Sequence, residues 1–563
     1  MVRIFPGRLE HTRVIPGLVP GTHFSKTSNA RECRAMDRGT ESRDDGGFFF
    51  FAAGKIALAA AATLAMLTSG IGIASAQTLK KGGTLTFAVV AEPPNYDCHA
   101  NVTFGHVHPI IPHYSTLLKI DAKNYPKVVG DLAKSWKAEA DGLTYTFKLH
   151  PNIKFHDGSP LTSADIKASY ERIIKPPAGV ISVRMSYYSD IDVIETPDPE
   201  TVVFKTKGPV AGVFELLASP FNCIYSAAKL KENPKYPETE ILGTGAFAYV
   251  ENVRGSHWVA KRFEGYFRPG LPYLDGYKAV FVKSPAVVPG LIGGQFDAEF
   301  RFRMPPERDQ LMEKMKDKVV LHEMPLLAGN TIIFNTRRKP FDDIRVRQAL
   351  VHAIDRWGGG QQLGKISGAR YPGGIMRTGA AMALPEAELV KIPGYWKDSE
   401  KARLEAKRLL KEAGVENLTF KLLNRAQIES YTVMGVFLID QFRRIGVTVQ
   451  HEQLETKLYL DGLRNGNFDV GVEFISDYLD DPTQQFIKFL STKATPLAYS
   501  GHTDRKIDEL YEKQRRMLDP AARLKLVHEL DIYANTQAYS QLLLWSERIV
   551  VMPKKIQGWY MTP

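Results

Sequence analysis

The segment at residues 141–173 constrains the fold more than any other part of this 563-residue chain. Residues 144–149 alternate polar and apolar side chains with period two, which predicts a half-buried strand. A turn and a short second strand at 154–156 follow. A helix is then expected from about Thr162, whose hydroxyl can cap the first backbone N–H groups. This strand–turn–strand–helix unit is generic and by itself names no function.

Strands and helices alternate along the rest of the chain. Gly414 and Gly446 stand where two of the predicted helices should end. The order predicts an α/β chain with a parallel sheet in each of two lobes. The predicted strands cover 83–90, 201–206, 278–283, 418–423 and 447–451, and the predicted helices cover 346–356, 399–413, 433–445 and 503–515.

Residues 48–76 have the order of a secretory signal peptide. Lys55 precedes an apolar run rich in Ala and Leu, which ends in the small-x-small site Ala74-Ser75-Ala76. We therefore expect cleavage before Gln77 and a periplasmic protein. No Cys stands at the cleavage point, so a lipid anchor is not expected. The alternative is a transmembrane anchor, because residues 56–73 reach the lower length limit for a span.

The remaining length and charge narrow the class of protein. Residues 1–47 are polar and lack apolar periodicity, so either the true start lies further on or they form a disordered extension. Residues 77–563 are too many for one core and suit two large lobes. The formal net charge of +11 is spread along the chain without a long Lys/Arg run, which argues against a nucleic-acid partner.

Cys98 and Cys223 are the cysteines that remain after the expected cleavage. In an oxidising periplasm an even pair predicts a disulfide. The alternative is two separate buried thiols, which pack as small apolar residues. Both positions fall in the part expected to form the first lobe, so we favour the bridge as a local staple.

Five segments in order carry a family resemblance. The string DGLTYTFKLHPNIKFHDGSPLTSADI at 141–166 resembles the signature of the periplasmic solute-binding proteins of ABC importers. The resemblance is to the peptide/nickel (dipeptide- and oligopeptide-binding) family, solute-binding protein family 5. The four further matching segments are 132–136, 242–247, 293–297 and 340–350.

The resemblance implies a two-lobed periplasmic-binding-protein fold of type II, with its lobes joined by a hinge. Lobe I is expected at 77–300, with an extra subdomain inserted at 113–219. Lobe II is expected at 301–532, and residues 533–563 are expected to return to lobe I. The signature is then scaffold, not ligand site.

The implied function is capture of a peptide-like or other small polar solute between the lobes. Hinge closure and delivery to a membrane permease and its ATPase would follow. We expect a monomer without a cofactor; a metal chelate is the alternative ligand, because nickel- and haem-binding members belong to this family. A secreted chaperone or receptor on the same fold is another class. No G-x-S-x-G nucleophile motif is present, so we expect no enzyme.

The resemblance also implies two ligand contacts in lobe II. Asp477 aligns with the Asp that pairs with the ligand's α-amino group in dipeptide-binding members, and Phe474 and Tyr478 flank it. Arg425 occupies the place of the Arg that binds the ligand carboxylate. Together these charges would clamp a zwitterion. The alternative is that Arg425 and Asp477 are strand-end charges in ordinary ion pairs.

His106 and His108 are predicted ligand contacts from lobe I. Their i, i+2 spacing would place both rings on one face of an extended segment. A cluster with His99 and His113 makes a metal site conceivable, but prolines interrupt the segment and the spacing matches no structural-metal pattern. We therefore predict no metal site; the alternative to cleft-lining histidines is a surface position.

Overall fold

A computed structural model describes residues 80–101, 103–426, 431–476 and 479–563. The chain separates into the units Met1–Thr78 and Leu79–Pro563, and the described residues belong to the second unit. The expected extension at 1–47 and signal peptide at 48–76 therefore lie outside the described residues. No helix within the described ranges is long and apolar enough to cross a membrane.

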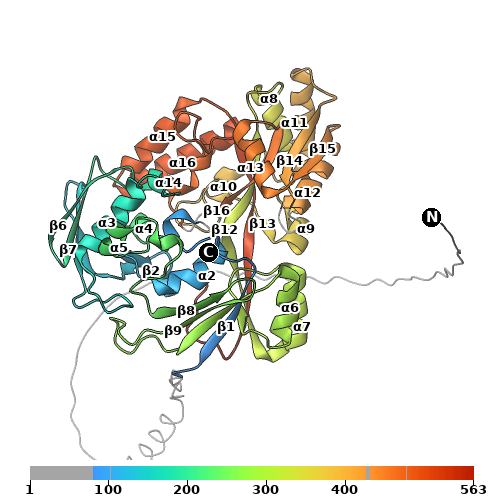
Figure 1. Ribbon diagram of the computed structural model, residues 1–563. Helices are drawn as coiled ribbons and strands as arrows, with labels where there is room; N and C mark the ends of the chain where they lie inside the picture. The colour runs from blue at the N-terminus through green and yellow to red at the C-terminus, as the bar shows by residue number, and fades with distance from the viewer. Residues whose placement is uncertain (1–79, 102, 427–430, 477–478) are drawn as a thin grey trace, which may run out of the picture. The chain divides into compact units, whose positions relative to one another are not determined.

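The first sheet has five strands in the order β11-β1-β10-β9-β8 (Figure 1). β1 pairs in parallel with β10 and β11, whereas β8, β9 and β10 form antiparallel pairs. The prediction of a parallel sheet is wrong here, because strands joined by a short turn, such as β8 and β9, must run antiparallel. The strands are β1 (Thr84–Val89), β8 (Phe247–Val253), β9 (His257–Arg262), β10 (Gly276–Phe281) and β11 (Ala298–Glu299).

The second sheet has six strands in the order β13-β17-β12-β16-β14-β15. It is also mixed, since β14 runs parallel to β15 and β16, whereas β12 pairs antiparallel with β16 and β17. The strands are β12 (Val319–Phe334), β13 (Ala369–Tyr371), β14 (Thr419–Arg425), β15 (Thr448–Leu454), β16 (Val470–Ser476) and β17 (Ser540–Pro553).

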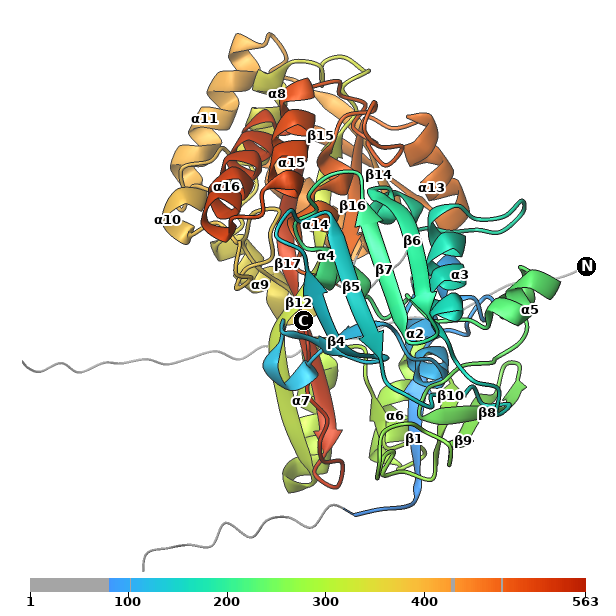
Figure 2. The ribbon, with the colours of Figure 1, turned by 90° about the vertical axis from the view of Figure 1, so that its left-hand side faces the viewer.

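Two long antiparallel strands, β12 and β17, connect the two halves of the described chain (Figures 1 and 2). Val319 at the start of β12 and Val551 near the end of β17 pack with Ala88 of the first sheet. Ile332 and Leu544, at the opposite ends, belong to the core of the second sheet. At about 3.3 Å per residue, strands of this length reach from one core to the other.

Contacts cross the expected lobe boundaries at 301 and 533. Helix α7 (Pro305–Met315) follows residue 301, yet its Leu311 packs with Ala88 and with Leu291 of α6 (Val287–Ile292) in the first half. Likewise Leu543 of β17 packs in the second half, and only the end of that strand reaches the first. The strands β12 and β17 therefore each have one end in the first half and the other end in the second half.

A four-stranded antiparallel sheet, β4-β5-β7-β6, is inserted between β1 and β8 (Figure 2). Tyr145, Phe147 and Leu149 alternate into its core, as the sequence pattern predicts. The Thr162 backbone N–H donates to the Asp165 carboxylate at 2.7 Å, which caps helix α3. The second strand predicted at 154–156 is reduced to a single Lys154–Pro160 bridge. The elements are β4 (Ala133–Ala138), β5 (Thr144–Leu149), α3 (Ser163–Ile174), β6 (Ile191–Asp198) and β7 (Thr201–Thr206).

Helices surround the second sheet and complete its core. The predicted helices at 399–413 and 433–445 are present as α11 and α12, and Gly414 has a φ of +72° beyond the end of α11. The longer helices are α8 (Ile344–His352), α9 (Gly358–Ser367), α11 (Ser399–Glu412), α12 (Val433–Arg443), α13 (Thr456–Asn465), α15 (Arg505–Arg516) and α16 (Pro520–Gln537).

Candidate functional site

A cavity of about 690 Å³ lies where the first sheet, the inserted subdomain and the long strands β12 and β17 meet. Leu85 and Phe87 of β1 form part of its wall, and helix α2 (Phe104–Ile110) forms another part. Ala328 contributes from β12, at the point where that strand begins to pair with β16 of the second sheet. The described wall is therefore built mainly by the first half, and β12 brings residues 326–328 of the second sheet to it.

Aromatic side chains make up much of the cavity wall. Phe87 packs edge-on against Phe300 with a centroid distance of 5.2 Å, and Phe300 lies 6.1 Å from Trp559. A rigid aromatic wall buries large apolar area at a small entropic cost. The aromatic lining residues are Phe87, Phe104, Tyr114, Tyr125, Phe247, Tyr266, Tyr277, Phe300, Trp559 and Tyr560.

Asp131 supplies the one side-chain carboxylate among the described lining residues, and the protein's own donors occupy it. Lys119 Nζ lies 3.1 Å from Asp131 Oδ1, and Arg268 Nη2 lies 3.0 Å from the same oxygen. The Thr116 backbone N–H donates to Oδ2 at 3.0 Å. Two cations thus face one anion, so this part of the wall has a net positive charge.

His108 is the titratable ring of the cavity wall. It lies edge-on against Phe300 at 5.8 Å and tilted against Phe104 at 5.6 Å. Burial, with the nearby Arg548 and Arg301 cations, lowers the pKa of His108 to about 3. The ring is therefore neutral at pH 7 and has one donor and one acceptor nitrogen. Within the described ranges, no residue forms a hydrogen bond with the His108 side chain.

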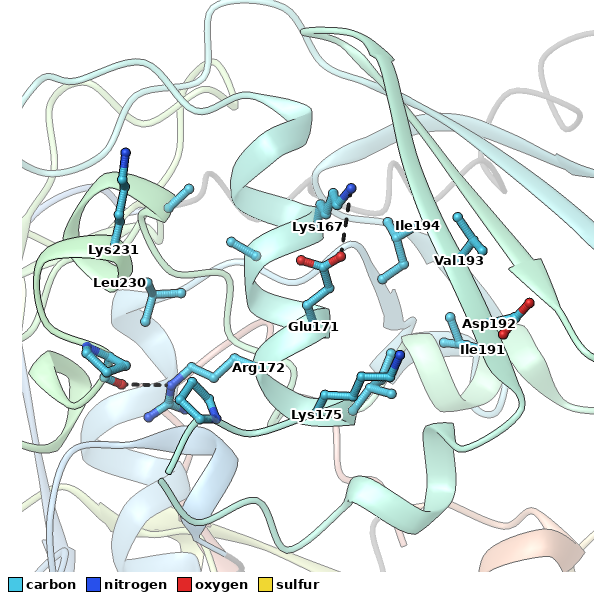
Figure 3. Close-up of a pocket in the computed structure, with 15 residues that line it drawn as sticks. Lys167, Glu171, Arg172, Lys175, Ile191, Asp192, Val193, Ile194, Leu230 and Lys231 are labelled. Carbon is cyan, nitrogen blue, oxygen red and sulfur yellow. Dashed lines mark hydrogen bonds and ion pairs between the residues drawn. The ribbon is translucent and has the colours of Figure 1, made fainter. Parts of the chain in front are cut away.

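A second concavity of about 540 Å³ lies on the inserted subdomain (Figure 3). Its lining comes from residues 167–234 alone, including α3, β6 and α5 (Ala227–Glu232). Lys167 and Glu171 form an i, i+4 ion pair at 3.8 Å on α3, and Arg172 donates to the Pro234 carbonyl at 3.0 Å. Because the second half of the chain contributes nothing to it, the larger cavity is the better candidate for a site that lobe closure would complete.

Comparison with known proteins assigns the family. The sequence profile described as "Bacterial extracellular solute-binding proteins, family 5 Middle" matches residues 127–496. The chain belongs to this family. Family 5 is a family of solute-binding proteins, so the resemblance found in the motifs is confirmed.

Two curated relatives of this family 5 chain are glutathione-binding proteins GsiB. That of Pectobacterium atrosepticum is 32% identical over 329 residues, which are 58% of this chain and 60% of the relative. That of Escherichia coli strain K12 is 32% identical over 306 residues, which are 54% and 56% of the two chains. The chain thus spans about 60% of the length of these curated relatives.

Solved structures support the fold. The binding protein AgaA of A. tumefaciens R10, in complex with agropinic acid, has a TM-score of 0.70 at 24% identity, covering 84% of this chain and 94% of that one. DppA of Helicobacter pylori, in complex with peptide STSA, has a TM-score of 0.71 at 22% identity, covering 85% and 95%. The expected two-lobed periplasmic-binding-protein fold is confirmed.

The structure separates the two histidines that were predicted to act together. His108 lines the cavity, whereas His106 is fully buried, with Nδ1 3.3 Å from the Asn95 carbonyl and its ring stacked on Phe221 at 6.3 Å. The prediction assumed an extended segment, but these residues lie in α2. Positions i and i+2 of a helix point about 200° apart. His106 therefore cannot share the cavity face with His108.

The other histidines of the segment have structural roles. His99 Nε2 lies 3.1 Å from the Cys223 carbonyl, and His113 Nδ1 lies 2.8 Å from the Phe247 carbonyl. Both rings are buried. In the part of the chain that the structure describes, no group of three His, Cys, Asp or Glu residues could hold a metal ion.

The predicted contacts in lobe II lie outside the cavity or outside the described residues. Arg425 Nε donates to Thr456 Oγ1 at 2.8 Å, and its guanidinium lies 5.6 Å from the centroid of the Tyr431 ring. Phe474 lies 6.1 Å from the same ring. Neither residue lines the cavity. Asp477 and Tyr478 are not among the described residues.

A disulfide joins Cys98 and Cys223, as the sequence predicts, across a Cα–Cα distance of 6.1 Å. Both residues are fully buried. The bridge ties the segment before α2 to the end of the inserted subdomain. It therefore braces the helix that presents His108 to the cavity.

Polar contacts join the inserted subdomain to the second half of the chain next to the cavity. Tyr125, which lines the cavity, donates from its hydroxyl to Asp480 at 2.8 Å. Asp480 is also paired with Arg377 at 2.6 Å. Further out, Asp190 receives both Arg515 and Arg516 from the end of α15. These contacts tie the inserted subdomain to the second half of the chain beside the cavity.

Proposed function

We propose that this protein is the extracytoplasmic solute-binding component of an ABC importer. It captures a small peptide-like solute in the cavity of about 690 Å³ and delivers it to a membrane permease with its ATPase. The observation that carries this proposal is the origin of the cavity wall, because a site built from both halves of the chain couples ligand binding to lobe closure. Nothing in this role requires catalysis or a second copy of the chain.

The ligand class follows from cavity size and from the relatives. Small-molecule sites have volumes of about 300–1,000 Å³, and the cavity lies within that range. The curated relatives are named for glutathione, and the structural neighbours hold agropinic acid and the peptide STSA. We therefore propose a solute of about tripeptide size. A periplasmic location suits the disulfide, because such bridges persist in oxidising compartments.

Arg425 and Asp477 remain part of the proposal as contacts from the second lobe. Arg425 is half-buried at the end of β14, and its guanidinium is held by Thr456 and Tyr431. A substitution test separates a ligand contact from an ordinary structural charge. If Arg425→Ala binds a confirmed ligand within a factor of about two of the wild-type Kd, Arg425 is not an anchor.

Thermal-shift and calorimetric titration of the full-length protein with glutathione, the dipeptide Met-Leu, the peptide STSA and agropinic acid test the function. A bound ligand at 100 times its Kd should add about 2.7 kcal/mol of stability. In the cavity, Phe300→Ala should weaken the binding of any solute that binds in this screen by about tenfold. Phe437→Ala on α12, in the second half and outside the cavity lining, is the control. Chemical turnover of a bound probe, or no binding by any of the four, contradicts the proposal.

A further inference from the structure

The cavity wall has a charge pattern that discriminates between solutes. Three charged side chains are found among the described lining residues, namely Lys119, Asp131 and Arg548. Arg268 stands directly behind Asp131 at 3.0 Å. The lining side chains thus present two cations and one carboxylate, and Arg268 is a further cation paired with that carboxylate.

Asp131 is poorly placed to receive a cationic ligand. Its side chain is only 9% exposed and already accepts from Lys119, Arg268 and the Thr116 backbone. Asp480, the next carboxylate beyond Tyr125, is likewise occupied by Arg377 and the Tyr125 hydroxyl. An ammonium group entering this side of the cavity would lose its water without gaining a free carboxylate, which disfavours its binding.

An anionic group meets the opposite situation. Lys119 is 41% exposed, so its ammonium can remain on Asp131 while also meeting a ligand. Arg268 continues to neutralise Asp131 when Lys119 is shared. Charges in a cleft of low dielectric are screened less than in water, which strengthens the preference.

His108 adds a neutral hydrogen-bonding group inside the aromatic wall. Its ring is held between Phe104 and Phe300, and within the described ranges it makes no side-chain hydrogen bond. Burial, with the nearby Arg548 and Arg301 cations, lowers the pKa of His108 and keeps the ring uncharged at neutral pH. The ring therefore offers a donor N–H to a solute in the cavity.

We propose that the first-lobe wall of this cavity selects solutes that carry an anionic group on an apolar body, and that Lys119 and His108 determine this specificity. The inference rests on the proposed function only in taking this cavity as the ligand site. It places anion recognition in the first lobe, in addition to the contact predicted for Arg425 in the second.

Three probes with one body and three charges test the selection. They are N-acetylphenylalanine (anion), N-acetylphenylalaninamide (neutral) and phenylalaninamide (cation), titrated into the full-length protein by calorimetry. The anion should bind at least about tenfold more tightly than the neutral probe, and the cation should bind least. Equal affinities, a preference for the cation, or an anion Kd weaker than about 1 mM would overturn the proposal.

Variants assign the preference to residues. Lys119→Met should reduce the anion-to-neutral ratio to about threefold or less, while Lys119→Arg should retain it, since the charge is kept. His108→Phe preserves the aromatic wall and should weaken the anion by about three- to tenfold through loss of one hydrogen bond. The controls are Lys205→Met, whose lysine forms an exposed ion pair with Glu195 at 2.6 Å, and His257→Phe on β9. An unchanged ratio in Lys119→Met would refute the assignment.

The outcomes separate this inference from the proposed function. Binding of glutathione without charge discrimination among the three probes would sustain the importer function and remove the anion selection. Charge discrimination that depends on Lys119, with none of the four solutes bound, would support the anion selection and contradict the proposed importer function.

Discussion

At the scale of single residues, His113 shows how burial determines protonation. Trp258 Nε1 lies 2.9 Å from His113 Nε2, and an indole N–H can only donate, so Nε2 is the acceptor. Nδ1 then carries the proton and donates to the Phe247 carbonyl at 2.8 Å. Burial lowers the pKa of His113 to about 3. Protonation would place a second proton against the Trp258 donor.

This arrangement predicts acid lability. Between pH 6.5 and about 3 the unfolded chain binds a proton at His113 that the folded chain does not, so stability is lost as pH falls below 6.5. The loss should approach about 1.4 kcal/mol per pH unit for one group. Guanidinium unfolding at pH 7.5 and pH 5 measures it. His113→Phe should be less stable at pH 7.5 yet lose less on acidification; an unchanged pH slope would contradict the prediction.

At the scale of elements, the end of α15 holds the inserted subdomain. Asp190 precedes β6 and pairs with Arg515 and, at 2.5 Å, with Arg516. The Ala211 backbone N–H donates to the Arg515 carbonyl at 2.8 Å. Asp190 and Arg515 are 10% and 12% exposed, so removal of the carboxylate leaves a poorly solvated cation.

Asp190→Asn should therefore loosen this contact and favour a more open protein. Breaking a partly buried pair from one side should cost about 1–3 kcal/mol of the closed form. Small-angle scattering of the unliganded protein should give a larger radius of gyration than the wild type. Glu195→Gln removes the exposed Lys205–Glu195 pair on the same subdomain and is the matched control. Identical scattering from Asp190→Asn and wild type would show that the Asp190 contact does not hold the inserted subdomain against α15.

At the scale of the whole molecule, the disulfide closes a long stretch of chain. Cys98 and Cys223 are separated by 125 positions, and the closed loop contains almost all of the inserted subdomain. Joining residues so far apart restricts the unfolded chain more than the folded one.

Replacement of both cysteines by serine should lower the free energy of unfolding by about 2–5 kcal/mol. Chemical unfolding of the double variant measures the loss. Thiol counting on the unfolded, unreduced protein that begins at Gln77 provides an independent check, because it should find no free thiol. Detection of two free thiols would refute the bridge.

Local chemistry explains most of what could be predicted. The alternation at 144–149, the capping pair Thr162 and Asp165, and the glycine after α11 each act within a few residues, so the elements they define are present. The first sheet was mispredicted because β8, β9 and β10 follow one another through short connections and so pair antiparallel. In the second sheet β12 pairs antiparallel with the distant β16 and β17, which no local pattern indicates. The order of the motifs along the chain also indicated the family, which the profile match confirms.

The sequence by itself predicted β5 and α3 of the signature, the family and the bridge between Cys98 and Cys223. Only the tertiary structure decided which residues face the cavity. His106 and His108 are two positions apart, yet the helical turn buries one ring and presents the other. Asp131 is occupied by Arg268, which is 137 positions away along the chain. Such neighbours follow from the packing of distant segments, and no local pattern in the sequence encodes them.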